Sequence, residues 1–132
     1  MTRSPLAEVR GVIEAPPDRV REALIKAMVP DSVRGEGTFT VEDFPGHTST
    51  VEVTADSIAF QGGWWYRGEW SLSRHPQGTL LVHQVHNVAT IARWAVPLAN
   101  RMFWGFRSST RDGFERGITD LGKQLGCSVH LT

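Results

Sequence analysis

The segment from residue 35 to residue 89 constrains the fold most, because apolar and polar side chains alternate along it with a period of two. Such alternation is typical of strands that bury one face. Turn residues interrupt the pattern at Pro45-Gly46, at Asp56 and between His75 and Gly78. No stretch between these turns is long enough for a helical crossover. The sequence therefore predicts a meander of about five antiparallel strands.

A sheet of this kind must bury its covered face against a second layer. Residues 6–13 predict a preceding strand, and Pro17–Met28 has the spacing of a short amphipathic helix. Residues 97–125 predict a helix of roughly 40 Å, the only one long enough to cover the sheet, with Gly126 as its cap. We predict an α+β fold, a single domain over residues 1–132, in which a curved antiparallel sheet wraps around this long C-terminal helix.

The long predicted helix carries its apolar and small residues on one face. On a helical wheel this packing face comprises Ala99, Met102, Phe103, Phe106, Thr110, Gly113, Gly117 and Leu121. A glycine inside a helix costs roughly 1 kcal/mol relative to alanine. We expect Gly113 and Gly117 to offset that cost by letting the helix approach the sheet closely.

Three segments in this order carry a family resemblance: APPDRVREAL at residues 15–24, GTLLV at residues 78–82 and LGKQLG at residues 121–126. With the layout above, the chain resembles the START-like helix-grip superfamily (SRPBCC), which includes the Bet v 1 allergens and the polyketide cyclase/dehydrase and lipid-transport group. The resemblance covers nearly the whole chain. It departs at residues 29–37, where larger members place a second helix. It implies an apolar cavity between sheet and helix, but no particular activity, because this fold hosts carriers, cyclases and receptors.

The aromatic strand after residue 63 is the most informative segment for a binding site. Alternation places Trp64, Tyr66 and Trp70 on its inner face, and Arg67 beside Glu69 on its outer face. The three rings either fill the core or line a gap that suits a flat apolar ligand.

Polar groups are also expected inside. The register typical of the family turns His83 and Asn87 inward on the last strand of the meander. His83 is either a buried imidazole with a structural partner, or a ligand contact or general acid–base group. His86 lies three residues further and points to the other face, so the two histidines cannot share a metal. The predicted ligand-binding residues are Trp64, Tyr66, Trp70, His83, Asn87, Met102, Phe103 and Phe106.

Composition argues against several functional classes. The 14 basic and 14 acidic residues balance, and no basic face marks a nucleic-acid binder. Cys127 is the single cysteine, which excludes an internal disulfide and a cysteine metal cluster. Nucleophile motifs and phosphate-binding loops are absent from the sequence, and we expect no metal or cofactor. Without a signal segment or an apolar run of about 18 residues, we expect a cytoplasmic protein with no stable membrane insertion. The predominance of arginine among the basic residues favours a GC-rich bacterial source.

The outer face of the predicted sheet carries an apolar set. Trp65, Leu80, Val82 and Val88 could form one patch there, and a patch of this kind predicts a homodimer. Residues 94–106 could instead touch a membrane while a lipid is loaded.

The leading functional prediction is a carrier or sensor that binds an apolar lipid, polyketide or aromatic molecule between the sheet and the C-terminal helix. One alternative is an aromatase/cyclase-type enzyme in which His83, Asn87 or Tyr66 polarises a carbonyl of a polyketide-like substrate. The other is an interaction domain that binds no ligand.

Overall fold

The computed structural model describes residues 5–30, 33, 35–62, 66–89 and 106–132, with the backbone alone for residues 43, 44, 47 and 106–108. Its elements in chain order are β1 (Ala7–Ile13), α1 (Pro17–Met28), β2 (Gly37–Phe44), β3 (His47–Val53), β4 (Ser57–Gly62), β5 (Tyr66–His75), β6 (Gly78–Asn87), α3 (Phe106–Leu125) and β7 (Val129–Leu131).

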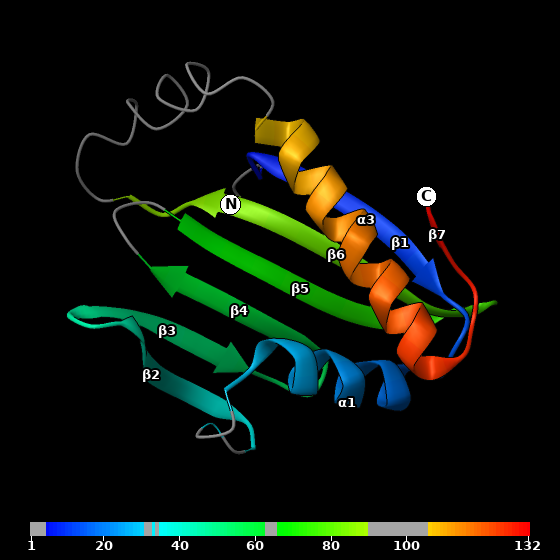
Figure 1. Cartoon of the computed structure of the whole chain (residues 1–132), viewed down its shortest axis with the longest axis horizontal. Coiled ribbons are helices and arrows are strands. Elements are labelled where there is room, and N and C mark those ends of the chain that lie inside the picture. The colour runs from blue at the N-terminus through cyan, green and yellow to red at the C-terminus, as the bar shows by residue number, and fades with distance from the viewer. Residues whose placement is uncertain (1–4, 31–32, 34, 63–65, 90–105) are drawn as a thin grey trace.

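Seven strands of the described chain form one sheet in the order β2-β3-β4-β5-β6-β1-β7 (Figure 1). Every neighbouring pair is antiparallel. Strands β2 to β6 follow one another along the chain, as the alternating pattern predicts, and β1 pairs with the remaining edge of β6. The predicted α+β class with an antiparallel sheet is confirmed.

The last strand, β7, is an element that the sequence pattern does not predict. Gly126 ends α3 in the left-handed region at φ 67°, as expected of a cap. The chain then reverses, and β7 pairs with β1 through Ile13 opposite Val129 and Gly11 opposite Leu131. Three residues are too few for an alternating pattern, so the pairing depends on the exposed edge that β1 offers.

Both helices lie on the same face of the sheet (Figure 1). Helix α3 contacts β1 and β7, whereas α1 contacts β5, β6 and α3. Helix α1 begins at Pro17 after an extended Pro16, where a missing N–H costs nothing, and its buried residues are Val20 and Leu24. Arg21 donates a hydrogen bond of 3.0 Å to the carbonyl oxygen of Thr54, which ties α1 to the β3–β4 turn.

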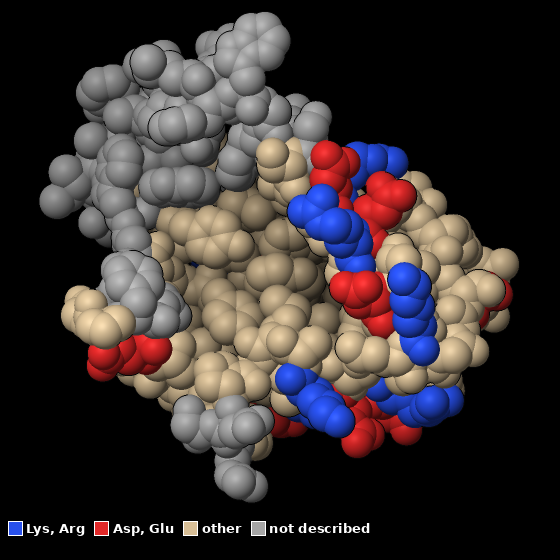
Figure 2. Space-filling view, in the orientation of Figure 1, with Lys and Arg blue, Asp and Glu red and all other residues tan. Residues whose placement is uncertain are grey.

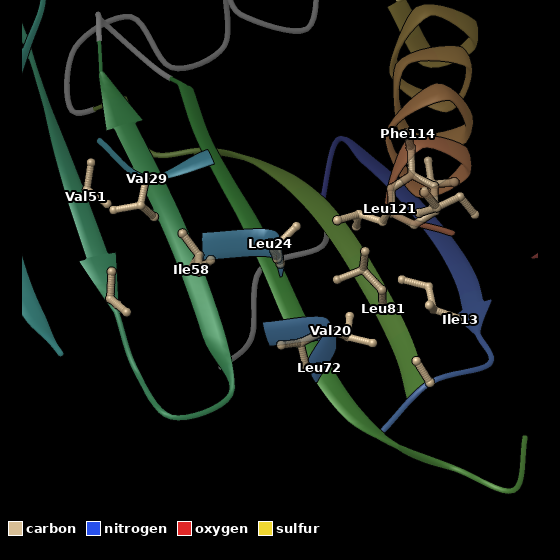
Figure 3. Close-up of a cluster of buried hydrophobic side chains, with 14 residues drawn as sticks. Ile13, Val20, Leu24, Val29, Val51, Ile58, Leu72, Leu81, Phe114 and Leu121 are labelled. Carbon is tan, nitrogen blue, oxygen red and sulfur yellow. The ribbon is translucent and has the colours of Figure 1, made fainter. Parts of the chain in front are cut away.

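The hydrophobic core extends beneath both helices (Figure 3). One part lies under α1, where Val20 and Leu24 pack with Ile58 and Leu72 from the sheet. The other part lies under α3. Its members include Ile13, Leu81, Phe114, Ile118 and Leu121. Because Leu81 on β6 stands between the two parts, the sheet and both helices share one continuous core.

The face by which α3 packs on the sheet differs from the predicted one. Its buried residues are Phe114, Ile118, Leu121 and Gly122, whereas Gly113 and Gly117 are exposed. The predicted packing face depends on the apolar residues between 99 and 106. The residues before Phe106 lie outside the described part of the chain. The bulky side chains at positions 114, 118 and 121 decide the orientation of α3.

The close approach of helix and sheet is accordingly provided by a different glycine. A Cβ on Gly11 of β1 would lie 2.9 Å from Cδ1 of Ile118 and 3.0 Å from Cε1 of Phe114. In contrast, a Cβ on Gly117 would meet no atom of the described residues within 4 Å. The prediction that Gly113 and Gly117 permit close packing is therefore wrong, and Gly11 has that role.

Candidate functional site

A cavity of about 520 Å³ lies between the two helices and the inner face of β5 and β6. Helix α1 contributes Leu24, Ala27 and Met28 to its wall. The strands contribute Tyr66, Trp70, Leu81, His83 and Val85, and α3 contributes Ser109, Thr110, Gly113, Phe114, Gly117, Ile118 and Leu121. This volume falls within the range of about 300–1,000 Å³ that is usual for small-molecule sites.

The cavity wall contains no Asp, Glu, Lys or Arg among the described residues. Figure 2 shows the corresponding hollow with an uncharged floor, while the charged side chains gather over the outer surface of α3 and along α1. A charged ligand would lose its hydration on entering and would find no opposite charge there. The lining therefore fits a neutral, largely apolar molecule.

Two of the aromatic residues predicted on β5 line this cavity. Tyr66 and Trp70 share the inner face of the strand, and Gly68 lies between them. A Cβ on Gly68 would clash with the hydroxyl group of Tyr66 and lie 3.2 Å from Cη2 of Trp70. The tyrosine ring thus extends over Gly68 toward Trp70. Burial raises the pKa of Tyr66 above its ordinary value, so the phenol remains neutral at physiological pH.

Trp70 is held from two directions. The ring of Phe60 meets it edge-on, with ring centroids 5.8 Å apart and planes at 89°. His83, its partner across the β5–β6 register, stacks on it with centroids 4.1 Å apart and planes 13° apart. Contacts of both kinds favour a fixed ring position.

His83 is buried, as the predicted register requires, and it lines the cavity. Its ring is also parallel to that of Phe114, with centroids 6.3 Å apart and planes 2° apart. Its Nδ1 lies 3.1 Å from the carbonyl oxygen of Glu69. Because a carbonyl can only accept, Nδ1 carries the hydrogen and donates it. Burial lowers the pKa of His83, and the hydrogen bond to Glu69 offsets this only in part. The imidazole is therefore neutral near pH 7.

Asn87 is buried on the inner face, as predicted, but it does not line the cavity. Its side-chain oxygen accepts a hydrogen bond of 3.0 Å from the backbone N–H of Ala89. A bond of this kind, from an asparagine to the backbone two residues further, typically fixes a turn. Asn87 therefore has a structural role at the end of β6.

The remaining predicted binding residues lie outside the description. Trp64, Met102 and Phe103 fall outside the described residues, and Phe106 begins α3 with its backbone alone described. The structure thus brings together Tyr66, Trp70 and His83.

Sequence reasoning missed α1 as part of the cavity wall, and it missed Phe114 and Ile118 on α3. Phe114, Ile118 and Leu121 recur at helical spacing, which is a sufficient signal for a buried face. On α1, the apolar stripe continues beyond the buried residues Val20 and Leu24 to Ala27 and Met28. Ala27 stays exposed and Met28 half-buried, and both line the cavity.

Gly113 and Gly117 form part of the cavity wall on α3. The nearest atom to a Cβ on Gly113 would be Nη2 of Arg116 at 3.9 Å, which is ordinary contact, and Gly117 has open space. Both positions are helical, so alanine would stabilise α3 by roughly 1 kcal/mol at each. Packing does not require glycine here. An added side chain would occupy space at the cavity.

The opposite face of the sheet carries a charged network. Arg67 donates to the carboxylates of Glu52 and Glu69, with Nε 2.7 Å from Glu69, and to Gln61. The predicted Arg67–Glu69 pair is present, but it is half-buried within this larger network rather than solvent-exposed as expected. Burial lowers the pKa of Arg67, but its hydrogen bonds and the charges of the two carboxylates outweigh that effect and raise it. Arg67 therefore remains charged, and its hydrogen bonds link β5 to β4 and β3.

The predicted outer patch is described only in part. Leu80 and Val82 on β6 and Val88 just after it are half-buried and alternate with the inward-facing residues such as His83, and Trp65 lies outside the described residues. The homodimer stays a prediction.

Among the described residues, no group of three or more His, Cys, Asp or Glu side chains could hold a metal ion. No described helix has the length and apolar character needed to cross a membrane. Comparison with protein-family models, with curated proteins and with solved structures found no match.

Proposed function

We propose that this chain binds a neutral apolar small molecule in the cavity formed by α1, α3, β5 and β6, with the sheet and C-terminal helix acting as in helix-grip proteins of the START-like superfamily. The support is the wall itself, which encloses about 520 Å³ and has no charged side chain among the described residues. Two aromatic residues, Tyr66 and Trp70, offer ring surface to a ligand.

The observation that carries the proposal is the pair of glycines at the cavity wall. Gly113 and Gly117 weaken α3, and neither is required by a close contact. A core that merely lacked optimal packing would gain from larger residues at both positions. Glycine is the residue that leaves the most space for a ligand, so the cost to the helix is accounted for by binding.

A carrier or sensor is favoured over a cyclase by the state of His83. A group that polarises a carbonyl must donate a hydrogen bond to it. The Nδ1 hydrogen of His83 is already bonded to Glu69, and the low pKa of the imidazole disfavours a second N–H. Neutral His83 can therefore accept a hydrogen bond in the cavity but not donate one. Asn87, the second of the three residues expected to polarise a carbonyl, lies outside the cavity wall, which leaves Tyr66 as the described candidate there.

Native mass spectrometry of the protein as purified tests the proposal. We expect a fraction of the chains to carry one small molecule that is lost on denaturation. Protein that carries no ligand, and that gains none when it is incubated with a mixture of neutral lipids and neutral aromatic compounds, would contradict the proposal.

A further inference from the structure

One nitrogen of His83 has no partner among the described residues. Nδ1 donates to the carbonyl oxygen of Glu69. The other ring nitrogen, Nε2, therefore has its lone pair exposed to whatever stands beside it. His83 is only 7% exposed, so bulk water does not solvate this atom freely. A buried acceptor that makes no hydrogen bond is costly, and buried polar side-chain atoms usually have a partner.

The ring cannot turn to satisfy Nε2 within the described residues. Trp70 stacks on it at 4.1 Å, Phe114 is parallel to it, and the Glu69 carbonyl holds Nδ1. The other polar side chains of the described cavity wall are Tyr66, Ser109 and Thr110, and the hydrogen bond of His83 goes to the Glu69 carbonyl rather than to one of them. The described part of the chain therefore offers Nε2 no donor, and a molecule that occupies the cavity can supply one.

We infer that the ligand is a neutral, ring-containing apolar molecule with one hydroxyl or N–H group, such as a phenol, which donates a hydrogen bond to Nε2 of His83. This inference rests on the proposed function. Trp70 and Phe114, which stack about the imidazole, would direct the donor toward the nitrogen because they leave its edge as the accessible part. A carboxylate has no hydrogen to donate and would meet no cation on the described wall. The inference therefore selects hydroxylated neutral compounds over fatty-acid anions.

Two probes of nearly equal shape separate this inference from simple apolar binding. 2-Naphthol has a donor hydroxyl, whereas 2-methoxynaphthalene has only an acceptor. By calorimetric titration of the full chain, we expect 2-naphthol to bind about tenfold more tightly, which corresponds to one net hydrogen bond made in a buried site. His83→Phe retains a flat ring between Trp70 and Phe114. It should remove the preference, so that the two probes bind the variant with affinities within about twofold of each other.

A measurement on the wild type covers the case in which His83→Phe does not fold. In protein labelled with ¹⁵N at histidine, Nε2 of His83 should give the signal of an unprotonated nitrogen and Nδ1 that of a protonated one. Addition of 2-naphthol should shift the Nε2 signal, and addition of 2-methoxynaphthalene should leave it nearly unchanged.

The outcomes distinguish the two claims. If both probes bind wild type with equal affinity and neither moves the Nε2 signal, the donor inference is overturned and the apolar cavity stands. If 2-methoxynaphthalene binds more tightly, the inference is overturned as well. If neither these probes nor a larger apolar probe such as N-phenyl-1-naphthylamine binds, the proposed function itself fails.

Discussion

The carbonyl oxygen of Glu69 lies 3.1 Å from Nδ1 of His83 and thereby fixes which imidazole nitrogen carries the hydrogen. The two residues belong to neighbouring strands, β5 and β6, and the register that places Trp70 opposite His83 brings this carbonyl to the ring. A backbone atom on the sheet thus determines that the cavity presents a hydrogen-bond acceptor. The chemistry of the site follows from strand register.

The burial of His83 predicts how stability depends on pH. Because its pKa is lower in the folded chain than the ordinary value of about 6.5, the unfolded chain binds the proton more readily. Wild type should therefore lose stability as pH falls below about 6.5, by at most about 1.4 kcal/mol per pH unit from this group.

Urea denaturation of wild type and His83→Phe at several pH values between 7.5 and 5 measures the effect. The variant lacks the hydrogen bond to Glu69 at every pH, and that loss is constant. The informative quantity is therefore how the difference in free energy of unfolding between the two proteins changes with pH. The difference should shrink as pH falls. Parallel curves for the two proteins would show that His83 does not titrate differently on folding.

Glycine substitutions at α3 and β1 should have opposite effects on stability. Gly117→Ala places a methyl group in open space and removes a helix-weakening residue, so we expect about 1 kcal/mol of added stability. Gly11→Ala forces a methyl group against buried Ile118 and Phe114, and should cost about 1–3 kcal/mol. Chemical denaturation at pH 7.5 compares them. Changes of the same sign would contradict the packing described for α3.

Arg67→Met should reduce stability without changing ligand binding. The Arg67 side chain is 20% exposed and its guanidinium joins Glu52 to Glu69, so its removal leaves two carboxylates close together on the outer face. Because this network is half-exposed, we expect a loss of only about 1 kcal/mol, smaller at high salt. Thermal or urea unfolding measures the loss. Weaker probe binding by the folded variant would show that the two faces of the sheet are coupled.

The strand pairing could be predicted from the sequence because a slip of one residue would turn a whole face outward. Thr79, Leu81 and His83 are accordingly buried in the expected register. The rotation of α3 could not be predicted in the same way, because residues 97–106 and the segment containing Phe114 and Ile118 suggest different faces. Strand β7 could not be predicted, because three residues are too few to show an alternation of apolar and polar side chains.

The candidate site was partly predictable for the same reasons. Alternation was sufficient to place Tyr66 and Trp70 on one face and His83 beside them. The tautomer of His83 depends on the position of a backbone carbonyl on another strand, which no local pattern encodes. The role of Gly117 depends on the absence of any neighbour, and only the packed structure reveals that.

The most direct test of ligand binding is a fluorescence titration with N-phenyl-1-naphthylamine on wild type, Gly117→Phe and Thr119→Phe. Both variants add a phenyl ring to an exposed position of α3, but only Gly117 lines the cavity. We predict saturable binding of one probe per wild-type chain, affinity reduced at least about tenfold in Gly117→Phe, and affinity within about twofold of wild type in Thr119→Phe. Equal affinity of wild type and Gly117→Phe, or binding only to unfolded protein, would contradict a ligand site in this cavity.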